Sequence, residues 1–442
     1  MVAAPIPWQE PWTAFRRLYR PGEGALFLDS NPAHSLPHLA RHSYAGVAPT
    51  GRFTAHRGED TSALRDLADV LHPEGAPDPR APPFQGGWAG IVSYDAGRLI
   101  EEIPSVARDD TRLPLIDLFR FDAVVAWDHA ARASWILVRP DAPPAAQQVL
   151  LQRLKGPPAA AEDPGLAPGV KPYMTRERFE QMVQEGKNHV RAGDVFQVNL
   201  SHRLEAAAPR DPLALYGRLR AANPAPFAAF FDAVDYQVLS SSPERLFTLR
   251  GRTLSARPIA GTRRRSPDPE EDAALKAELA ADEKERAEHV MLVDLARNDI
   301  GRVAEYGSVR VDELLTVETY RAVHHLVSNV EGTLRDGFGP VDALRALFPG
   351  GTITGAPKVE SMRIIERLEP VRRGPYTGSI GWFSATGDVD LNILIRTLLV
   401  KDGATHLQVG AGIVEDSVPA KEYEETLAKA KALLAALGAE AP

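Results

Sequence analysis

The pattern of apolar and polar residues differs between two parts of the chain. In the first part, apolar residues form short runs that are typical of strands, at residues 25–29, 91–94, 123–127 and 134–138. Residues 156–172 then contain five prolines and three successive alanines, a composition typical of a linker. We therefore expect an N-terminal domain at residues 1–165 and a second domain at residues 170–442.

The second part has longer segments in which apolar residues recur at helical spacing. Residues 282–296 predict a helix, and its apolar positions Ala287, Val290, Met291 and Leu295 lie on one face. Further helices are expected from residue 357 onward and over residues 420–437. The region after the linker is therefore expected to be richer in helix than the region before it.

Three apolar runs near the end of the chain predict strands, at residues 376–383, 391–400 and 406–414. Gly387-Asp388 and Asp402-Gly403 separate them, and both pairs favour hairpin turns. The three runs therefore predict an antiparallel meander. Strands joined by hairpins, with helices between groups of strands, favour an α+β fold with large antiparallel sheets over a doubly wound parallel sheet.

Charge and hydropathy exclude several classes of partner. The 442 residues include 51 Lys and Arg against 59 Asp and Glu, a net charge of −8, whereas a protein that binds nucleic acid through its phosphates needs the opposite excess. No stretch approaches the roughly 18 apolar residues of a membrane span. The first residues also lack the basic and apolar regions of a signal peptide. We expect a cytoplasmic protein without a nucleic-acid or membrane partner.

Two pairs of acidic residues are candidates for a metal site. The chain has no cysteine, so a metal would be held by oxygen or histidine, and a hard cation is expected. Glu285 and Glu288 lie three residues apart on one predicted helix, and Glu422 and Glu425 do so on another. Either pair alone is more often a solvated helix face. Together they suit Mg²⁺, which one or two carboxylates usually hold with anionic oxygens of the substrate.

Two further side chains are candidates for proton transfer. Glu244 follows a strand-like run at residues 238–239, and a partly desolvated carboxyl at a strand end can act as a general acid. The same residues equally form an ordinary turn. His324 and His325 begin another strand-like run, where adjacent residues point to opposite faces. At most one of these histidines can therefore enter a site.

Seven short motifs occur in the order seen in the chorismate-utilising enzymes. They are QVNL at 197–200, SPE at 242–244, RPIAGT at 257–262, DLARND at 294–299, HLVS at 325–328, GAPK at 355–358 and GAGI at 410–413. Over residues 170–435, and more weakly before them, the chain resembles the component I families of aminodeoxychorismate synthase and anthranilate synthase. The resemblance implies two large packed antiparallel β-sheets flanked by helices, with chorismate and Mg²⁺ held between two acidic helices.

The resemblance also implies roles for individual residues. Glu288 and Glu425 match direct ligands of Mg²⁺, and Glu285 and Glu422 match residues that support them through water. Chorismate would be bound by a larger set, namely Gly261, Thr262, Tyr376, Arg396, Gly410, Gly412 and Lys429. An arginine and a lysine in this set suit the two carboxylates of chorismate.

The implied reaction adds ammonia at ring C2 while the C4 hydroxyl departs. Glu244 matches the acid and base, and His325 and Thr352 match positions that stabilise the leaving hydroxyl. Gln197 stands where relatives that add water have a lysine base, and an amide cannot deprotonate water. Ammonia is therefore the expected nucleophile.

The motifs leave more than one product open. Residues 223–230, 323–328 and 350–355 resemble aminodeoxychorismate synthase, which serves p-aminobenzoate and folate synthesis and is our first prediction. Ala260 stands where many of these enzymes have a lysine that attacks C2 covalently. Without that lysine ammonia must attack C2 itself, as in anthranilate synthase, which is the alternative. A third alternative is a chorismate-binding subunit without catalysis.

Two further expectations concern other ligands. Because the chain has no cysteine, glutamine must be hydrolysed by a separate glutamine amidotransferase subunit that supplies the ammonia. The region where relatives hold tryptophan is matched by Ser30, Ser43, Pro226 and Phe227. Asp29 replaces the glutamate typical of the feedback-regulated form, so inhibition by tryptophan is not expected.

Overall fold

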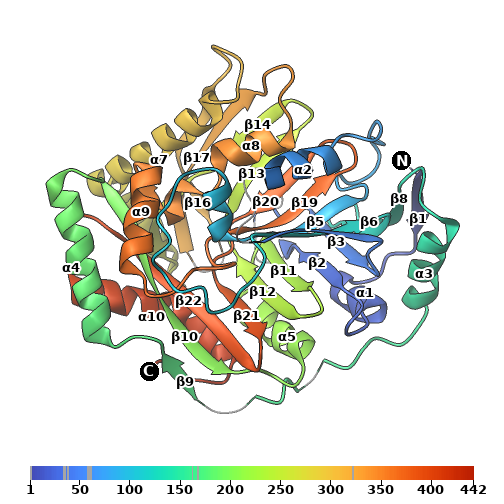
Figure 1. Ribbon diagram of the computed structural model, residues 1–442, viewed down its shortest axis with the longest axis horizontal. Coiled ribbons are helices and arrows are strands. Elements are labelled where there is room, and N and C mark those ends of the chain that lie inside the picture. Colours follow the sequence, from blue (N-terminus) through green and yellow to red (C-terminus); the bar gives the residue numbers. More distant parts are fainter. Residues whose placement is uncertain are drawn as a thin grey trace.

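The structure is a computed structural model that describes residues 2–32, 36, 39–56, 62–161, 163–166, 169–320 and 323–442. Two large sheets of antiparallel strands pack together, and helices cover their outer faces (Figure 1). This arrangement confirms the expected α+β fold. Within the described ranges, no helix has both the length and the apolar composition needed to cross a membrane.

The larger sheet is built from strands of both halves of the chain. Its strands, in spatial order, are β1 (Val2–Ile6), β8 (Ala133–Val138), β7 (Ala123–Asp128), β3 (His42–Val47), β2 (Ala25–Asp29), β11 (Phe227–Asp232), β12 (Tyr236–Ser242), β21 (Thr397–Lys401), β22 (Ala404–Ile413), β10 (Gln197–Ala207) and β18 (Gly355–Ala356), with β9 (Val170–Pro172) beside β10. Strand β7 is buried along its whole length, because the smaller sheet covers one face of this sheet and helices cover the other.

The smaller sheet also contains strands from both halves of the chain. Its strands, in spatial order, are β15 (Ile259–Arg264), β17 (Val323–Thr333), β14 (Thr253–Ala256), β13 (Arg245–Arg250), β20 (Val389–Asn392), β19 (Ser379–Ser384), β5 (Gly87–Val92), β6 (Ile116–Phe121) and β4 (Gly51–Ala55), with β16 (Arg310–Thr319) beside β17. Phe121 of β6 packs in one cluster with Phe231 of β11 and Val238 of β12, so an apolar core joins the two sheets.

Strand pairing crosses the expected linker in both sheets. Strand β2 pairs with β11 in the larger sheet, and β5 pairs with β19 in the smaller one. Without these partners each segment would present unpaired strand edges. The sheets therefore do not follow the division into residues 1–165 and 170–442, which stays a prediction about folding units.

The helices begin and end at residues that suit helix termini. They are α1 (Pro11–Leu18), α2 (Ser62–Val70), α3 (Pro144–Leu154), α4 (Arg176–Ala192), α5 (Pro212–Ala222), α6 (Pro269–Ala281), α7 (Glu283–Gly301), α8 (Pro340–Leu347), α9 (Lys358–Leu368) and α10 (Pro419–Ala436). Asp282 separates α6 from α7, and its side chain accepts a hydrogen bond of 3.0 Å from the backbone N–H of Glu285. A short 3₁₀ helix, η3, spans Gly351–Ile353.

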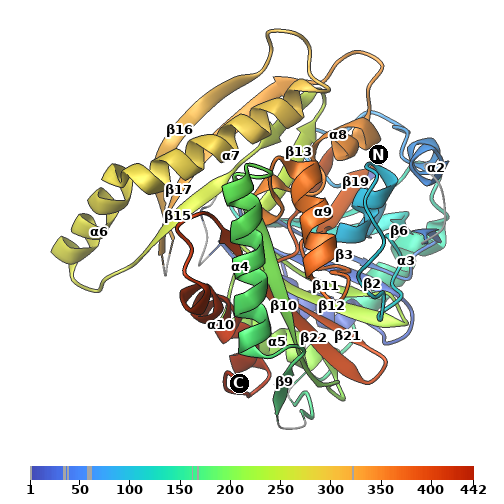
Figure 2. The ribbon, with the colours of Figure 1, turned by 60° about the vertical axis from the view of Figure 1, so that its left-hand side comes forward.

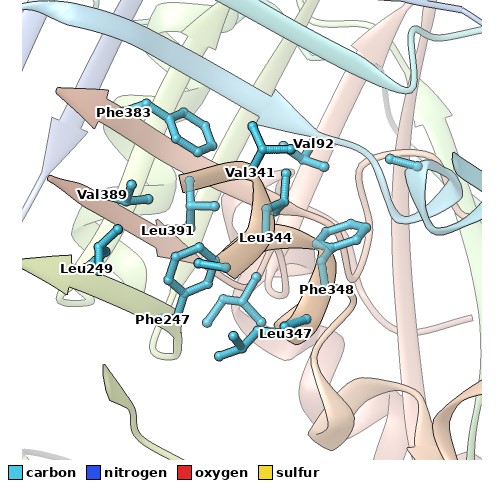
Figure 3. Close-up of a cluster of buried hydrophobic side chains, with 14 of the residues drawn as sticks. Val92, Phe247, Leu249, Val341, Leu344, Leu347, Phe348, Phe383, Val389 and Leu391 are labelled. Carbon is cyan, nitrogen blue, oxygen red and sulfur yellow. The ribbon is translucent and has the colours of Figure 1, made fainter. Parts of the chain in front are cut away.

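Helix α8 closes an apolar core over the smaller sheet (Figure 3). Val341, Leu344 and Leu347 recur at helical spacing on its buried face. They pack with Phe247 of β13 and Leu391 of β20. This packing holds β13 and β20, the two strands that adjoin the candidate site.

The buried face of α7 is not the apolar face that the spacing picks out. Ala287 is exposed and Val290 is 42% exposed, so that face does not form the core. Helix α7 instead runs along β15 and β17 (Figure 2) and buries Leu292, Val293 and Ile300 with a polar residue, His289. The Nε2 atom of His289 lies 2.7 Å from the Ser328 hydroxyl of β17. The buried face of α7 therefore combines apolar residues with a polar contact, which apolar spacing alone did not reveal.

The predicted meander near the end of the chain was also wrong in one respect. The turns at Gly387 and Gly403 do join antiparallel strands, β19 to β20 and β21 to β22. However, residues 391–400 form two strands that belong to different sheets. Between them, Arg396 adopts a left-handed backbone conformation with φ of 53°. The chain thus crosses from one sheet to the other and places Arg396 between them.

Candidate active site

A cavity of about 260 Å³ lies where the two sheets meet. Strands β10 and β22 of the larger sheet and β15 and β17 of the smaller one contribute to its walls, with η3 and α10. It brings together most of the predicted catalytic and substrate-binding residues, namely Glu244, Thr262, His325, Thr352, Tyr376, Arg396, Gly410 and Lys429. The remaining three, Gln197, Gly261 and Gly412, do not line the cavity but contact residues next to it.

Glu244 lies in the turn between β12 and β13, where its side chain is 9% exposed. The hydroxyl of Thr352 in η3 donates a hydrogen bond of 2.7 Å to its Oε1 atom. Burial raises the pKa of Glu244 to about 7, although the Thr352 hydrogen bond acts in the opposite direction. A carboxyl with this pKa can both give and take a proton near neutral pH.

His325 enters the cavity from β17, whereas His324 points to the other face, as expected. The Nε2 atom of His324 lies 3.1 Å from Asp272. The Nδ1 atom of His325 lies 3.2 Å from the carbonyl oxygen of Gly261 and 3.0 Å from the hydroxyl of Thr262. A carbonyl oxygen can only accept, so the bond to Gly261 requires a proton on Nδ1. Burial lowers the pKa of His325 and favours the neutral ring. In that form its Nε2 atom is a hydrogen-bond acceptor.

Two cationic side chains lie on the side of the cavity formed by β22 and α10. Arg396 Nη1 donates a hydrogen bond of 2.8 Å to the backbone carbonyl of Lys429. Lys429 Nζ donates one of 3.0 Å to the carbonyl of Gly410 and pairs with Glu425 at 2.6 Å. Burial lowers the pKa of Arg396, but a guanidinium remains protonated in proteins. A ligand with two carboxylates would therefore meet two cations here.

The two predicted glycines of β22 differ in what a side chain would meet. A Cβ atom on Gly410 would lie 2.8 Å from the backbone oxygen of Leu200 and 2.9 Å from the hydroxyl of Tyr376, so glycine is required there. A Cβ atom on Gly412 would overlap with the side-chain nitrogen of Gln197, which is the end of a flexible side chain that can move. Gln197 thus contacts the strand at Gly412 and does not line the cavity.

Asn199 is a cavity residue to which the sequence gave no role. Its side-chain oxygen is buried and accepts no hydrogen bond from the part of the chain that the structure describes. Gln408 lines the same cavity and was likewise not predicted. Asn199 lies within the QVNL motif, and its place in that motif could have indicated from the sequence that it lines the cavity.

The two acidic helices approach one another beside this cavity. Helix α7 covers the smaller sheet and α10 covers the larger one. Burial raises the pKa of Glu288, and the negative charges of Glu285 and Glu422 add to the effect. Burial likewise raises the pKa of Glu422, with a contribution from Glu425. The carboxylates of the two helices thus repel one another, and a divalent cation between them would stabilise this arrangement.

These carboxylates do not form a complete metal site by themselves. Glu285 accepts a hydrogen bond of 3.1 Å from Arg263, and Glu425 pairs with Lys429. Among the described residues, no three His, Asp or Glu side chains gather closely enough to hold a metal ion. The oxygen donors suit Mg²⁺ only if a bound anion supplies further ligands. The metal assignment of Glu285, Glu288, Glu422 and Glu425 stays a prediction.

A buried ion pair that the sequence analysis did not include supports the cavity wall. Arg373 pairs with Glu369 at 2.6 Å, and both are almost fully buried. The guanidinium of Arg373 also donates hydrogen bonds to the carbonyl oxygens of Ile353, at 2.9 Å, and Asn199, at 2.7 Å. It lies 5.7 Å from the centre of the Tyr376 ring. Arg373 therefore holds η3, β10 and Tyr376 in one arrangement.

Comparison with known proteins decides the family. The family model for chorismate binding enzymes matches residues 25–435. The chain belongs to this family. The resemblance drawn from the seven motifs is thereby confirmed, and the cavity with its acid–base carboxyl and two cations is the candidate active site of a chorismate-binding enzyme.

Relatives of this chorismate-binding enzyme carry two different names. It is 42% identical over 421 residues to aminodeoxychorismate synthase component 1 of Bacillus subtilis, covering 90% of this chain and 89% of the relative. It is 45% identical over 443 residues to anthranilate synthase component 1 of Thermus thermophilus, covering 97% and 95%. The crystal structure of anthranilate synthase component I from Streptococcus pneumoniae TIGR4 matches with a TM-score of 0.80 and 38% identity, covering 90% of this chain and 92% of that one.

The chorismate-binding enzyme has a second cavity, of about 290 Å³, in the region predicted for tryptophan. Ser30, Pro226 and Phe227 line it together with Trp382. Ser43 lies behind this wall, fully buried, and its hydroxyl accepts a hydrogen bond of 3.1 Å from the backbone N–H of Ser30. The structure thus brings the four predicted residues together. Tryptophan as the ligand stays a prediction.

Proposed function

We propose that the chain is component I of an aminodeoxychorismate synthase, which aminates chorismate with ammonia to form 4-amino-4-deoxychorismate. The observation that carries the proposal is the buried Glu244, with a pKa of about 7, in a cavity that also contains Arg396 and Lys429. The two cations suit the carboxylates of chorismate, and the carboxyl suits proton transfer to a hydroxyl that leaves the ring.

The first step is amination at ring C2. The lone pair of ammonia forms a bond to C2, the two ring double bonds shift, the C4–oxygen bond breaks, and the new C–NH3⁺ group then loses a proton. Glu244 gives its proton to the departing hydroxide, which leaves as water, while the Thr352 hydroxyl holds the carboxyl in position. The neutral His325 ring can accept a hydrogen bond from the C4 hydroxyl and so orient it.

The second step determines the product. To form the 4-amino compound, a second ammonia adds at C4 and the amine at C2 departs, so one ammonia is consumed overall. Ala260 lines the cavity and offers no amine to attack C2 covalently. This alanine favours a second candidate function, anthranilate synthase, in which the first adduct instead loses pyruvate. The relative from Thermus thermophilus supports this alternative.

We further propose that Glu288 and Glu425 hold Mg²⁺, supported by Glu285 and Glu422. When bound, the cation supplies positive charge for a carboxylate of chorismate. Because the chain has no cysteine, we propose a glutamine amidotransferase subunit as the source of ammonia. A cytoplasmic location stays a prediction.

One assay separates these functions. The purified protein is incubated with chorismate, Mg²⁺ and an ammonium salt at mildly alkaline pH. A product that keeps its enolpyruvyl group, and yields p-aminobenzoate only after a lyase is added, supports the proposal. Release of pyruvate with fluorescent anthranilate would establish the alternative. Binding of chorismate without turnover at saturating ammonium would contradict both and favour a non-catalytic binding subunit.

A further inference from the structure

A smaller cavity lies on the other side of Glu244 and Thr352 from the chorismate cavity. It measures about 50 Å³, and we refer to it as the α7 cavity because Leu292, Leu295, Ala296 and Asp299 of that helix form one wall. Glu244 and Thr352 line both cavities. These two hydrogen-bonded side chains therefore form the partition between them.

The size of the α7 cavity restricts what it can admit. One water molecule needs about 10–15 Å³ of such space, so the cavity has room for a few molecules of that size. Chorismate and glutamine are far larger. Ammonia is similar in size to water and is the reactant that the proposed function requires besides chorismate.

The lining of the α7 cavity suits a neutral molecule. Most of it is apolar, with Leu246, Leu292, Leu347 and Ile393 among its residues. Its charged residues other than Glu244 each have a partner: Arg245 pairs with Asp390 at 2.9 Å, Arg257 with Glu318 at 2.6 Å, and Asp299 with Lys358 at 2.7 Å. Compensated charges exert little net field on a molecule within.

Two residues in the wall of the α7 cavity lie partly at the surface. Leu295 and Ala296 are partly exposed, in contrast to the fully buried Phe247 of the core nearby. Another small cavity, of about 20 Å³, adjoins the chorismate cavity at Tyr376 and Gln408, but Arg203, Arg372 and Arg373 line it. This cavity has less than half the volume of the α7 cavity, and most of its lining residues are polar or charged, with Arg203 paired to Asp110 and Arg373 to Glu369. The larger and mostly apolar α7 cavity is therefore the better route for neutral ammonia.

We propose that ammonia enters the chorismate cavity through the α7 cavity, passing between Leu295 and Ala296 at the surface and Glu244 and Thr352 inside. This inference rests on the proposed amination of chorismate. Ammonia arrives as the neutral molecule and bonds to the ring carbon, while protonated Glu244 gives its proton to the departing hydroxide, which leaves as water. The new C–NH3⁺ group then returns a proton to the Glu244 carboxylate. The proton count balances, with one water released for each ammonia consumed.

The test narrows the entrance without changing the chorismate cavity. In Ala296→Phe, we expect kcat/KM for ammonium to fall about tenfold, while kcat at saturating ammonium stays near the wild-type value. The Kd of chorismate, measured by calorimetry, should not change. Ala274→Phe is the matched control, because Ala274 lies on the neighbouring helix α6, is exposed and does not line either cavity. It should leave both kinetic parameters unchanged.

Two results would overturn the proposed route. One is a wild-type kcat/KM for ammonium in Ala296→Phe. The other is a lower kcat at saturating ammonium, which would indicate that Glu244 is displaced. If Ala296→Phe does not fold, Ala296→Leu makes the same test with a smaller side chain. Failure of the proposed function is separate, since wild-type protein would then show no amination of chorismate at all.

Discussion

The Thr352 hydroxyl donates a hydrogen bond of 2.7 Å to the carboxyl of Glu244, although the two residues lie 108 positions apart in the chain. This bond stabilises the ionised carboxylate and lowers its pKa, while burial raises it. The balance places the pKa at about 7. The two residues thus set the pH range in which the site can transfer a proton.

Replacing Thr352 by valine should shift the pH dependence of catalysis. A hydrogen bond to a charged group contributes about 1.5–3 kcal/mol, and a change of one pKa unit corresponds to about 1.4 kcal/mol. Because Glu244 must be protonated to act as the acid, kcat falls as pH rises through its pKa. In Thr352→Val we expect this fall to move upward by about one pH unit. The measurement is kcat against pH at saturating chorismate and ammonium, with exposed Thr253→Val as the control. An unmoved profile would contradict the assigned contact.

Replacing Glu244 by glutamine should abolish turnover but stabilise the fold above neutral pH. The folded-state pKa of about 7 exceeds the ordinary value of 4.5, so the folded state binds more protons than the unfolded state between these values. The free energy of unfolding therefore falls as pH rises through this window, by up to about 3 kcal/mol. A glutamine at this position does not titrate, so the free energy of unfolding of Glu244→Gln should not show this fall. Urea unfolding at pH 8 and at pH 4 tests it: the variant should be more stable than wild type only at pH 8. Exposed Glu440→Gln should show no such difference.

Removing either proposed metal ligand should abolish the Mg²⁺-dependent activity. Glu288→Gln and Glu425→Gln are expected to lose turnover while keeping the wild-type circular dichroism spectrum. Because protons compete with a cation for carboxylates, and burial raises the pKa of Glu288, Mg²⁺ affinity should weaken as pH falls. Glu424→Gln is the control, since Glu424 pairs with Arg176 away from the cavity. Wild-type rates in either ligand variant would exclude that residue as a ligand.

Breaking the ion pair between Arg373 and Glu369 should destabilise the protein. Removal of one partner leaves a buried charge without compensation, which costs about 3–5 kcal/mol. Arg373→Met should therefore lower the free energy of unfolding by this amount in a urea titration. The double variant Arg373→Met with Glu369→Leu should recover part of the loss. Because Arg373 also holds Asn199 and Ile353, we expect a higher KM for chorismate in the single variant. Equal stability of Arg373→Met and wild type would refute this role.

Local features of the chain were predictable because they depend on residues close in sequence. The turns at Gly387 and Gly403 join antiparallel strands, as expected. The opposite orientation of His324 and His325 followed from the geometry of a single strand. The ordered motifs, in turn, identified the family and contain half of the residues that line the cavity.

Only the tertiary structure decided which distant segments meet. Residues 391–400 look like one strand, yet pairing with different sheets divides them and places Arg396 in the cavity. The buried face of α7 includes a contact between His289 and Ser328 from a distant strand, and the pKa of Glu244 is raised by burial in the folded chain. Sequence patterns record the preferences of neighbouring residues, whereas burial and electrostatic fields arise from groups that only strand pairing and sheet packing bring together.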